Sequence, residues 1–277
     1  MPPDGRWVAL AEGNEANVYE SLVLNARLPG FAVCREAGVV ALRSTAARSA
    51  LLVNRVIGCG VEGGLDEAQL DRLLALYGDA GCGIELGAAL CTPEVLGWLK
   101  GRRFRRLVNS QMMVCETSRA KAAGRYDTWS RNAGLRVEQV GAEHASIVAG
   151  LCRENFKVSA SLGEFVRAGM VGPGWRRWLA FDGDTAVGAS LSHVRDGVGW
   201  FGWTSVSASH RGRWIHAGFV ARQFEDAVES GCRWITTDTA QGTRERPDPV
   251  HLNLKRFGFV DAYLRPLFVR GPVRRPG

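Results

Sequence analysis

Apolar residues in the first half of the chain recur in alternating helix-like and strand-like patterns. The clearest helix is predicted over 65–81, because its apolar residues repeat at intervals of three and four and Gly81 is placed to end it. A second helix is predicted over 92–104, where Thr92 can cap the N-terminus and a proline follows in the first turn. The other elements expected here are a helix over 13–27 and strands over 31–35, 38–43, 51–60, 83–90 and 106–116.

The second half repeats such a pattern after a polar stretch that lacks clear apolar periodicity. Residues 175–206 alternate over three strands, and the Asp-Gly pairs at 182–183 and 196–197 are typical of hairpin turns. The other elements expected here are a strand over 135–140, helices over 142–156 and 161–170, a helix ending near Ser230, a strand over 232–240, a short helix over 249–259 and a last strand over 262–271. We therefore predict an α/β protein with domains at 1–118 and 135–277, joined by a linker over 119–134.

Composition narrows the class of protein. The 277 residues are 46% hydrophobic and 23% charged, as in ordinary globular proteins. No apolar run approaches the ~20 residues of a membrane helix, and the early acidic residues do not resemble a signal peptide. The seven cysteines are odd in number and never form a Cys-x-x-Cys pair, which favours reduced thiols over disulfides or zinc. We expect a cytoplasmic protein without a metal and without a membrane partner.

Positive charge is in excess and clustered. Thirty-five Lys and Arg residues against 28 Asp and Glu residues give a net charge of +7. Two interpretations stay open: an arginine-rich protein from a GC-rich genome, or a protein that binds a polyanion such as RNA. The candidate RNA-binding residues are Arg102, Arg103, Arg105, Arg106, Arg176, Arg177, Lys255 and Arg256.

Two landmarks in the second half suggest a family. A strand ending in "TSVSASHRGRW" is followed by a helix, a strand, the segment "NLKRFGF" and a final strand. Over about 135–270 this order resembles the GNAT acyltransferase superfamily. The first half carries "LKGRRF" where the second carries "LKRFGF", which resembles a degenerate first copy; two unrelated α/β halves are the alternative. The resemblance implies two tandem GNAT-like domains, each a mixed, mostly antiparallel twisted sheet flanked by helices, with a V-shaped splay between central parallel strands.

The resemblance also implies a donor site, from which this chain departs. The family binds the pyrophosphate of coenzyme A on a loop patterned Gln/Arg-x-x-Gly-x-Gly/Ala. Arg211 matches the first position, but Trp214 and His216 stand at the two small residues. An indole there conflicts with phosphate oxygens that approach backbone N–H groups to about 3 Å. In addition, Leu254 stands where the family often has a tyrosine acid. The donor-binding residues implied are Val206, Ser207, Arg211, Gly212, Arg213, Trp214, His216 and Asn253.

These departures favour an aminoacyl-tRNA donor, as in the Fem-type and leucyl/phenylalanyl-tRNA–protein transferases that share a tandem GNAT-like plan. We expect an acyltransferase that forms an amide on a small-molecule amine, with a small aminoacyl-tRNA, plausibly glycyl-tRNA, as co-substrate in a specialised biosynthetic pathway. No tightly bound cofactor is expected. The alternatives are an acetyl-CoA-dependent N-acetyltransferase and a non-catalytic module that binds RNA or protein.

Three side chains are catalytic candidates. Asp238 lies late in a strand where the central strands are expected to part, and it can orient or deprotonate an amine. His193 and Thr204 lie on strands that can face the cleft. Each also has a purely structural interpretation, as a strand-end, core or hairpin residue. An oxyanion would be stabilised by a backbone N–H at Val206 or Ser207.

Overall fold

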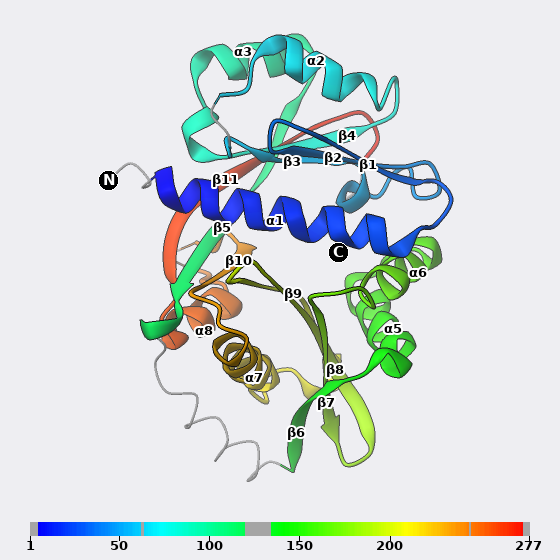
Figure 1. Ribbon diagram of the computed structural model, residues 1–277, viewed down its shortest axis with the longest axis vertical. Helices are drawn as coiled ribbons and strands as arrows, with labels where there is room; N and C mark the ends of the chain where they lie inside the picture. The colour runs from blue at the N-terminus through cyan, green and yellow to red at the C-terminus, as the bar shows by residue number, and fades with distance from the viewer. Residues whose placement is uncertain (1–4, 62–63, 120–133, 244, 274–277) are drawn as a thin grey trace.

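The computed structural model describes residues 5–61, 64–119, 134–243 and 245–273. Within them, eleven strands form one mixed sheet in the order β1-β2-β3-β4-β11-β5-β10-β9-β8-β7-β6 (Figure 1). The strands of the first half are β1 (Phe31–Glu36), β2 (Val39–Ser44), β3 (Arg55–Cys59), β4 (Cys82–Leu86) and β5 (Arg105–Glu116). Those of the second half are β6 (Leu135–Val140), β7 (Trp175–Asp182), β8 (Thr185–Arg195), β9 (Val198–Val206), β10 (Trp234–Ala240) and β11 (Val260–Arg270).

The two halves of the chain exchange their last strands. β11 lies between β4 and β5, and β5 lies between β11 and β10, with antiparallel pairing at all three contacts. β11 pairs with β4 only from Leu267 onwards, directly after Pro266, which has no N–H to donate. The sheet of each half therefore includes a strand from the other half.

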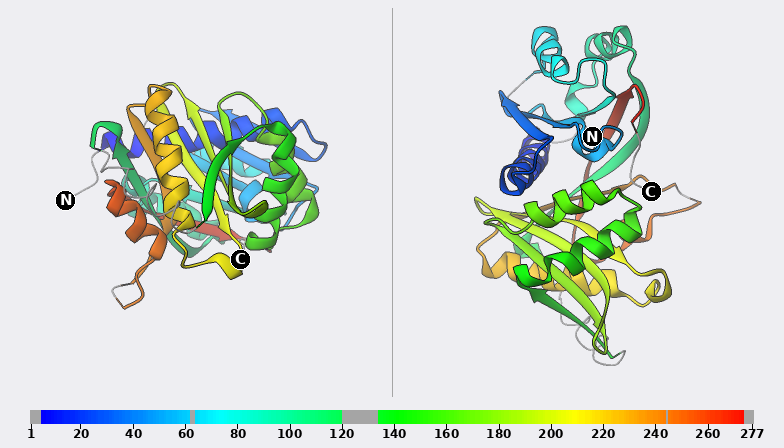
Figure 2. Two further views of the ribbon diagram at one scale, coloured as in Figure 1. Left: turned by 90° about the horizontal axis from the view of Figure 1, so that it is seen from below. Right: turned by 90° about the vertical axis from the view of Figure 1, so that its right-hand side faces the viewer.

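Helices cover both faces of the sheet. α1 (Gly5–Ala26) lies across both halves and packs on strands of each as well as on α6 (Figure 1). The apolar residues of α1, α5 and α6 share one core with β2, β3 and β7–β9. The opposite face carries α2 and α3 in the first half and α7 and α8 in the second (Figure 2). The bounds of these helices are α2 (Glu67–Ala75), α3 (Pro93–Gly101), α5 (Ala145–Phe156), α6 (Ala160–Gly169), α7 (Ile215–Glu229) and α8 (Pro249–Phe257).

The parallel strands β9 and β10 separate part of the way along their length. Their register covers only three pairs and ends at Trp200 opposite Thr236. Further along, β9 contains a bulge: the register with β8 shifts between Ala189 and Leu191, and Trp203 adopts a left-handed backbone with φ of 53°. The splay that the family resemblance implies is confirmed.

Most elements are confirmed, and the differences have local causes. Both hairpins form, although the first turns at Gly183 and Asp184 because Asp182 still pairs with Thr185, and α8 ends at Gly258 with φ of 102°. The strand expected over 51–60 is interrupted, because Leu51–Val53 form a 3₁₀ turn before β3. α1 begins eight residues earlier than its pattern indicated, since its packing face extends over both halves. All but the two end residues of the linker expected over 119–134 lie outside the described residues.

Three global features complete the fold. None of the helices in the described ranges has the length and apolar character needed to cross a bilayer. All seven cysteines fall within these ranges and are unpaired. The same ranges hold no group of three or more His, Cys, Asp or Glu side chains arranged to hold a metal ion.

Candidate active site

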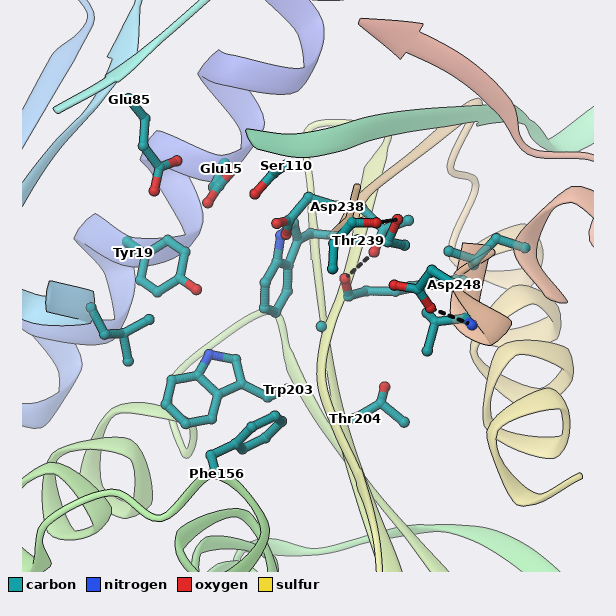
Figure 3. Close-up of a pocket in the computed structure, with 18 of the residues that line it drawn as sticks. Glu15, Tyr19, Glu85, Ser110, Phe156, Trp203, Thr204, Asp238, Thr239 and Asp248 are labelled. Atoms are coloured by element: carbon teal, nitrogen blue, oxygen red, sulfur yellow. Dashed lines mark hydrogen bonds between the residues drawn. The ribbon is translucent and has the colours of Figure 1, made fainter. Parts of the chain in front are cut away.

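A cavity of about 510 Å³ lies where the two halves of the chain meet. One part of its lining comes from α1, the 3₁₀ turn before β3, and the end of α5; another comes from α7, α8 and the segment before α8 (Figure 3). These two groups of elements cover opposite faces of the sheet. The cavity therefore passes through the sheet in the space where β9 and β10 separate. A donor and an acceptor can reach each other there from opposite faces.

A buried ionic network forms one wall of the cavity. Arg265, from the exchanged strand β11, is 2% exposed. Its guanidinium donates a hydrogen bond to Glu15 of α1 and forms an ion pair of 2.7 Å with Glu85 of β4. Arg55 donates to Glu85 and lies 3.5 Å from Glu15. The Arg55 guanidinium also stacks over Tyr19, 4.4 Å from the ring centre. None of these partners could be inferred from sequence spacing, since Arg265 and Glu15 are 250 positions apart.

Glu12 belongs to the same network on its far side from the cavity. The residue is fully buried, and its carboxylate accepts a hydrogen bond of 2.6 Å from the hydroxyl of Tyr263. Burial raises the pKa of Glu12 to about 7; Arg265 and Tyr263 oppose the rise, while Glu15 and Glu85 add to it. The network therefore holds three carboxylates against two guanidiniums, and burial raises the pKa of both Glu12 and Glu15.

This gives a pH-dependent stability. A carboxyl with a folded pKa of about 7 and an unfolded value near 4.5 favours folding below pH 4.5, and this contribution is lost as pH rises through 7. We expect Glu12→Gln to remove a decline in the free energy of unfolding between pH 4.5 and 7, measured by urea denaturation at several pH values. Glu20→Gln, which alters an exposed pair with Arg35 on the same helix, is the control. An unchanged pH profile in Glu12→Gln would contradict this account.

Asp238 stands at the centre of the cavity. It lies on β10 two residues beyond the last pairing with β9 and lines the cavity together with Thr237 and Thr239 (Figure 3). No described residue forms a hydrogen bond or an ion pair with its carboxylate, although its charge raises the pKa of Glu15. A partly exposed carboxylate without a partner is available to a substrate. The sequence-based choice of Asp238 as a catalytic candidate thus coincides with an accessible position.

The loop before α7 has backbone conformations that are typical of glycine. Gly212 and Trp214 both have left-handed backbones, with φ of 78° and 62°. A Cβ built at Gly212 meets nothing within 4 Å. Trp214 occupies the N-cap position of α7, and its side chain makes no hydrogen bond to the first turn. The backbone N–H groups of the first turn of α7 are therefore uncapped.

The two bulky side chains of this loop have different surroundings. Trp214 is 44% exposed, and its ring lies 5.2 Å from the guanidinium of Arg256 on α8. His216 lines the cavity, and its Nδ1 is 3.3 Å from Nδ2 of Asn253. Burial lowers the pKa of His216 to about 4, so its imidazole is neutral at pH 7. Trp214 is thus directed to the surface beside α8 and His216 towards the strand gap.

A hairpin carboxylate anchors the same loop. Asp182, at the β7–β8 turn, accepts hydrogen bonds from Arg213 at 2.9 Å and from His210 at 3.2 Å. These contacts lower the pKa of Asp182 below its usual value. Arg211 instead donates to the carbonyl of Val206 at 3.3 Å. Arg213 therefore shapes the loop rather than extending freely towards a ligand.

The other predicted residues are distributed as follows. Thr204 lines the cavity, and its hydroxyl lies 2.7 Å from that of Ser190. His193 is absent from the lining; it is 2% exposed, packs against Trp175, and burial lowers its pKa to about 4. The N–H of Ser207 donates to the carbonyl of Val187 at 2.9 Å and so is not free for an oxyanion. Of the three catalytic candidates, the structure brings together Asp238 and Thr204.

The basic residues predicted to bind RNA do not form one surface. Arg102, Arg103, Arg105 and Arg106 lie at the α3 end of the molecule, whereas Arg176 and Arg177 lie on β7 at the other end (Figure 1). Several are already paired: Arg102 with Asp71 and Glu67, Arg176 with Asp226, and Lys255 with Asp261. Arg256 contacts Trp214, as described above.

Sequence patterns did not predict the buried ionic network, whose carboxylates and Tyr19 form the acidic wall of the cavity. Glu12, Glu15 and Tyr19 follow one another at helical spacing in α1, together with buried apolar residues. That spacing was a usable signal, because charges on the apolar face of a helix need buried partners. Arg55, Glu85 and Arg265 likewise interrupt strand segments that are otherwise apolar.

Solved structures share this architecture. No protein-family model matches the sequence, and no curated protein matches it significantly. A GCN5-related N-acetyltransferase from Kribbella flavida superposes with a TM-score of 0.63 at 15% identity, covering 93% of this chain and 95% of its own. A tandem GNAT protein from the clavulanic acid biosynthesis pathway gives 0.60 at 16% identity, covering 98% and 95%. A GCN5-related N-acetyltransferase from Sphaerobacter thermophilus gives 0.53 at 13% identity, covering 75% and 65%. With its splayed parallel strands and two joined halves, the chain adopts the GNAT fold in its tandem form.

Proposed function

We propose that the protein is an acyl-CoA-dependent N-acyltransferase that forms an amide on a small cationic amine. The observation that carries the proposal is the cavity itself, which joins the α7 face to the acidic α1 face through the gap between β9 and β10. Such a passage brings a thioester and an amine together without either crossing the sheet. The GCN5-related N-acetyltransferase and the tandem GNAT protein that share this fold support a donor of the coenzyme A type.

The donor side fits a diphosphate. The uncapped amides at the start of α7 supply N–H donors and the positive end of a helix dipole. The left-handed backbone at Gly212 and Trp214 preserves the turn although the side chain at 214 is large. Because Trp214 is turned towards Arg256 at the surface, its indole does not carry the steric objection that the sequence suggested.

The acceptor side fits an amine. Four carboxylates line the cavity, from Glu15, Glu85, Asp238 and Asp248, against the single guanidinium of Arg55. A protonated amine is attracted there and loses its proton to Asp238 or to water before attack. The nitrogen then bonds to the acyl carbon, the carbon–sulfur bond breaks and sulfur leaves as a thiolate, and the nitrogen passes its surplus proton to water or to that thiolate. Leu254, which is buried and lines the cavity, supplies no acid to that thiolate.

Aminoacyl-tRNA, the donor that the sequence favoured, is the competing proposal. His216 reaching into the strand gap and Leu254 in place of a tyrosine remain consistent with it. Against it, the predicted basic residues are dispersed and partly neutralised.

One assay decides between the donors. The purified protein is incubated with acetyl-CoA and a panel of amines, and free thiol and acetylated amine are measured together. We expect equal amounts of both products and no effect of ribonuclease. Turnover with glycyl-tRNA alone, abolished by ribonuclease, would overturn the proposal. Absence of turnover with either donor, together with no thermal stabilisation by millimolar acetyl-CoA, would indicate a non-catalytic module.

A further inference from the structure

The charge of the cavity wall exceeds what its own arginines neutralise. Glu15, Glu85 and Asp238 form one interacting group with Arg55 and Arg265, which leaves one more carboxylate than guanidiniums even when Glu12, on the far side of the network, carries its proton. Asp248 lines the cavity as well, but it also caps α8 by accepting the N–H of Val250 at 2.7 Å. In a protein of net charge +7, this concentration of acid at one site is a local feature. A surplus of buried carboxylate favours a cationic ligand.

Aromatic rings line the same cavity. Tyr19 and Trp200 pack edge to face, with ring centres 6.1 Å apart, and Phe156 and Trp203 do the same at 5.6 Å. Trp203 is supplied by the β9 bulge, which gives it a left-handed backbone. Aromatic faces attract ammonium and alkylammonium groups. Carboxylates and aromatic rings that line one cavity recognise the same ligand chemistry.

A buried amide oxygen points the same way. Gln223 of α7 is 1% exposed and lines the cavity. The orientation of its amide group is fixed, because Nε2 donates to the hydroxyl of Ser190 at 2.9 Å and to the carbonyl of Leu191 at 3.0 Å. Oε1 is left without a donor among the described residues. A buried acceptor without a donor favours an N–H group of a ligand.

The reacting nitrogen cannot itself neutralise the wall. An amine attacks a thioester only through its lone pair, so it must be uncharged when the new bond forms. The surplus of carboxylate would then be unbalanced at the moment of reaction. We propose that the acceptor carries a second cationic group, which stays bound against Glu15, Glu85 and the aromatic rings while its other amine reacts beside Asp238. This rests on the proposed N-acyltransferase function and names its acceptor class as a diamine or polyamine.

The test compares acceptors of equal length. With acetyl-CoA as donor, we expect kcat/KM for 1,5-diaminopentane to exceed that for n-pentylamine and 5-amino-1-pentanol by at least tenfold. The compound 5-amino-N,N,N-trimethylpentan-1-aminium has one reactive amine and a permanent charge, and it should match the diamine. Equal kcat/KM values for the diamine and the monoamine would overturn the inference while leaving the proposed function intact.

Variants locate the recognition. Glu15→Gln should reduce the preference for 1,5-diaminopentane over n-pentylamine to less than threefold, because the second cationic group then loses one of its carboxylates. Glu20→Gln, an exposed acid on the same helix paired with Arg35, should keep the full preference. An undiminished preference in a folded Glu15→Gln protein would contradict the assignment. If that variant unfolds, Trp203→Leu tests the aromatic wall and should reduce the preference at least threefold.

Failure of the proposed function can be distinguished from failure of the inference. If no amine is acetylated, direct calorimetric binding of 1,5-diaminopentane to the wild-type protein is measured without a donor. Binding that exceeds that of n-pentylamine tenfold supports the cation site although the acyl transfer is absent. Equal or undetectable binding of both compounds overturns it.

Discussion

Replacing Asp238 by Asn is expected to lower kcat/KM for amine acylation by at least about 100-fold, within the range that a positioned acid–base group contributes. The carboxylate is partly exposed in the cavity, has no partner among the described residues, and lies at the point where β9 and β10 have separated. Asparagine keeps the shape but cannot accept the proton of an ammonium group. Steady-state kinetics with acetyl-CoA and 1,5-diaminopentane provide the measurement, and the affinity for acetyl-CoA should stay unchanged.

Asp248→Asn is the matched control. Asp248 also lines the cavity, but it caps α8 through the N–H of Val250, a bond that asparagine can retain. We expect it to lower kcat/KM less than tenfold. A decrease of less than threefold in Asp238→Asn would remove Asp238 from the chemistry and leave it as a charge that only attracts the acceptor.

Replacing Arg265 by Met is expected to cost about 3–5 kcal/mol of unfolding free energy, as when one partner of a buried ion pair is removed. Arg265 is 2% exposed and pairs with Glu15 and Glu85 from elements of the other half of the chain. Without it, Glu12, Glu15 and Glu85 face only Arg55 in a buried site. Urea denaturation at pH 7.5 measures the loss, and the double variant Arg265→Met/Glu15→Gln should recover part of it.

Arg35→Met gives the comparison for an exposed pair. Arg35 binds Glu20 at 2.7 Å on the surface of α1, where such a pair is worth about 0–1 kcal/mol. A loss in Arg265→Met as small as that in Arg35→Met would show that the network does not hold the two halves together.

Local sequence patterns were enough to predict most helices and strands of the second half. The hairpin turns need left-handed backbones at Gly183 in the first and at Asp196 and Gly197 in the second, and Gly258 ends α8 for the same reason. Asp238 could be found because a strand near the splay ends in a carboxylate. These predictions depend on neighbours in sequence, so a pattern is enough to make them.

The complete pairing within the buried ionic network could not be predicted, because Arg265 reaches Glu15 and Glu85 only from the exchanged strand β11. The "EGNEANVYE" segment of α1 looks like a solvent-exposed helix face, and Arg265 looks like an isolated charge in an apolar strand. Their pairing depends on β11 lying beside β4. The steric interpretation of Trp214 was incomplete for a similar reason, since the direction of its indole is set by Arg256 on another helix.

The position of β11 has a consequence for biosynthesis on the ribosome. One edge of β4 stays unpaired until residues 260–270 have been translated, because the strand that covers this edge follows β4 far along the chain. A nascent chain shorter than this exposes the edge of a β-sheet to other chains. We expect premature stop codons in that stretch to yield insoluble protein rather than a shortened, folded amino-terminal half.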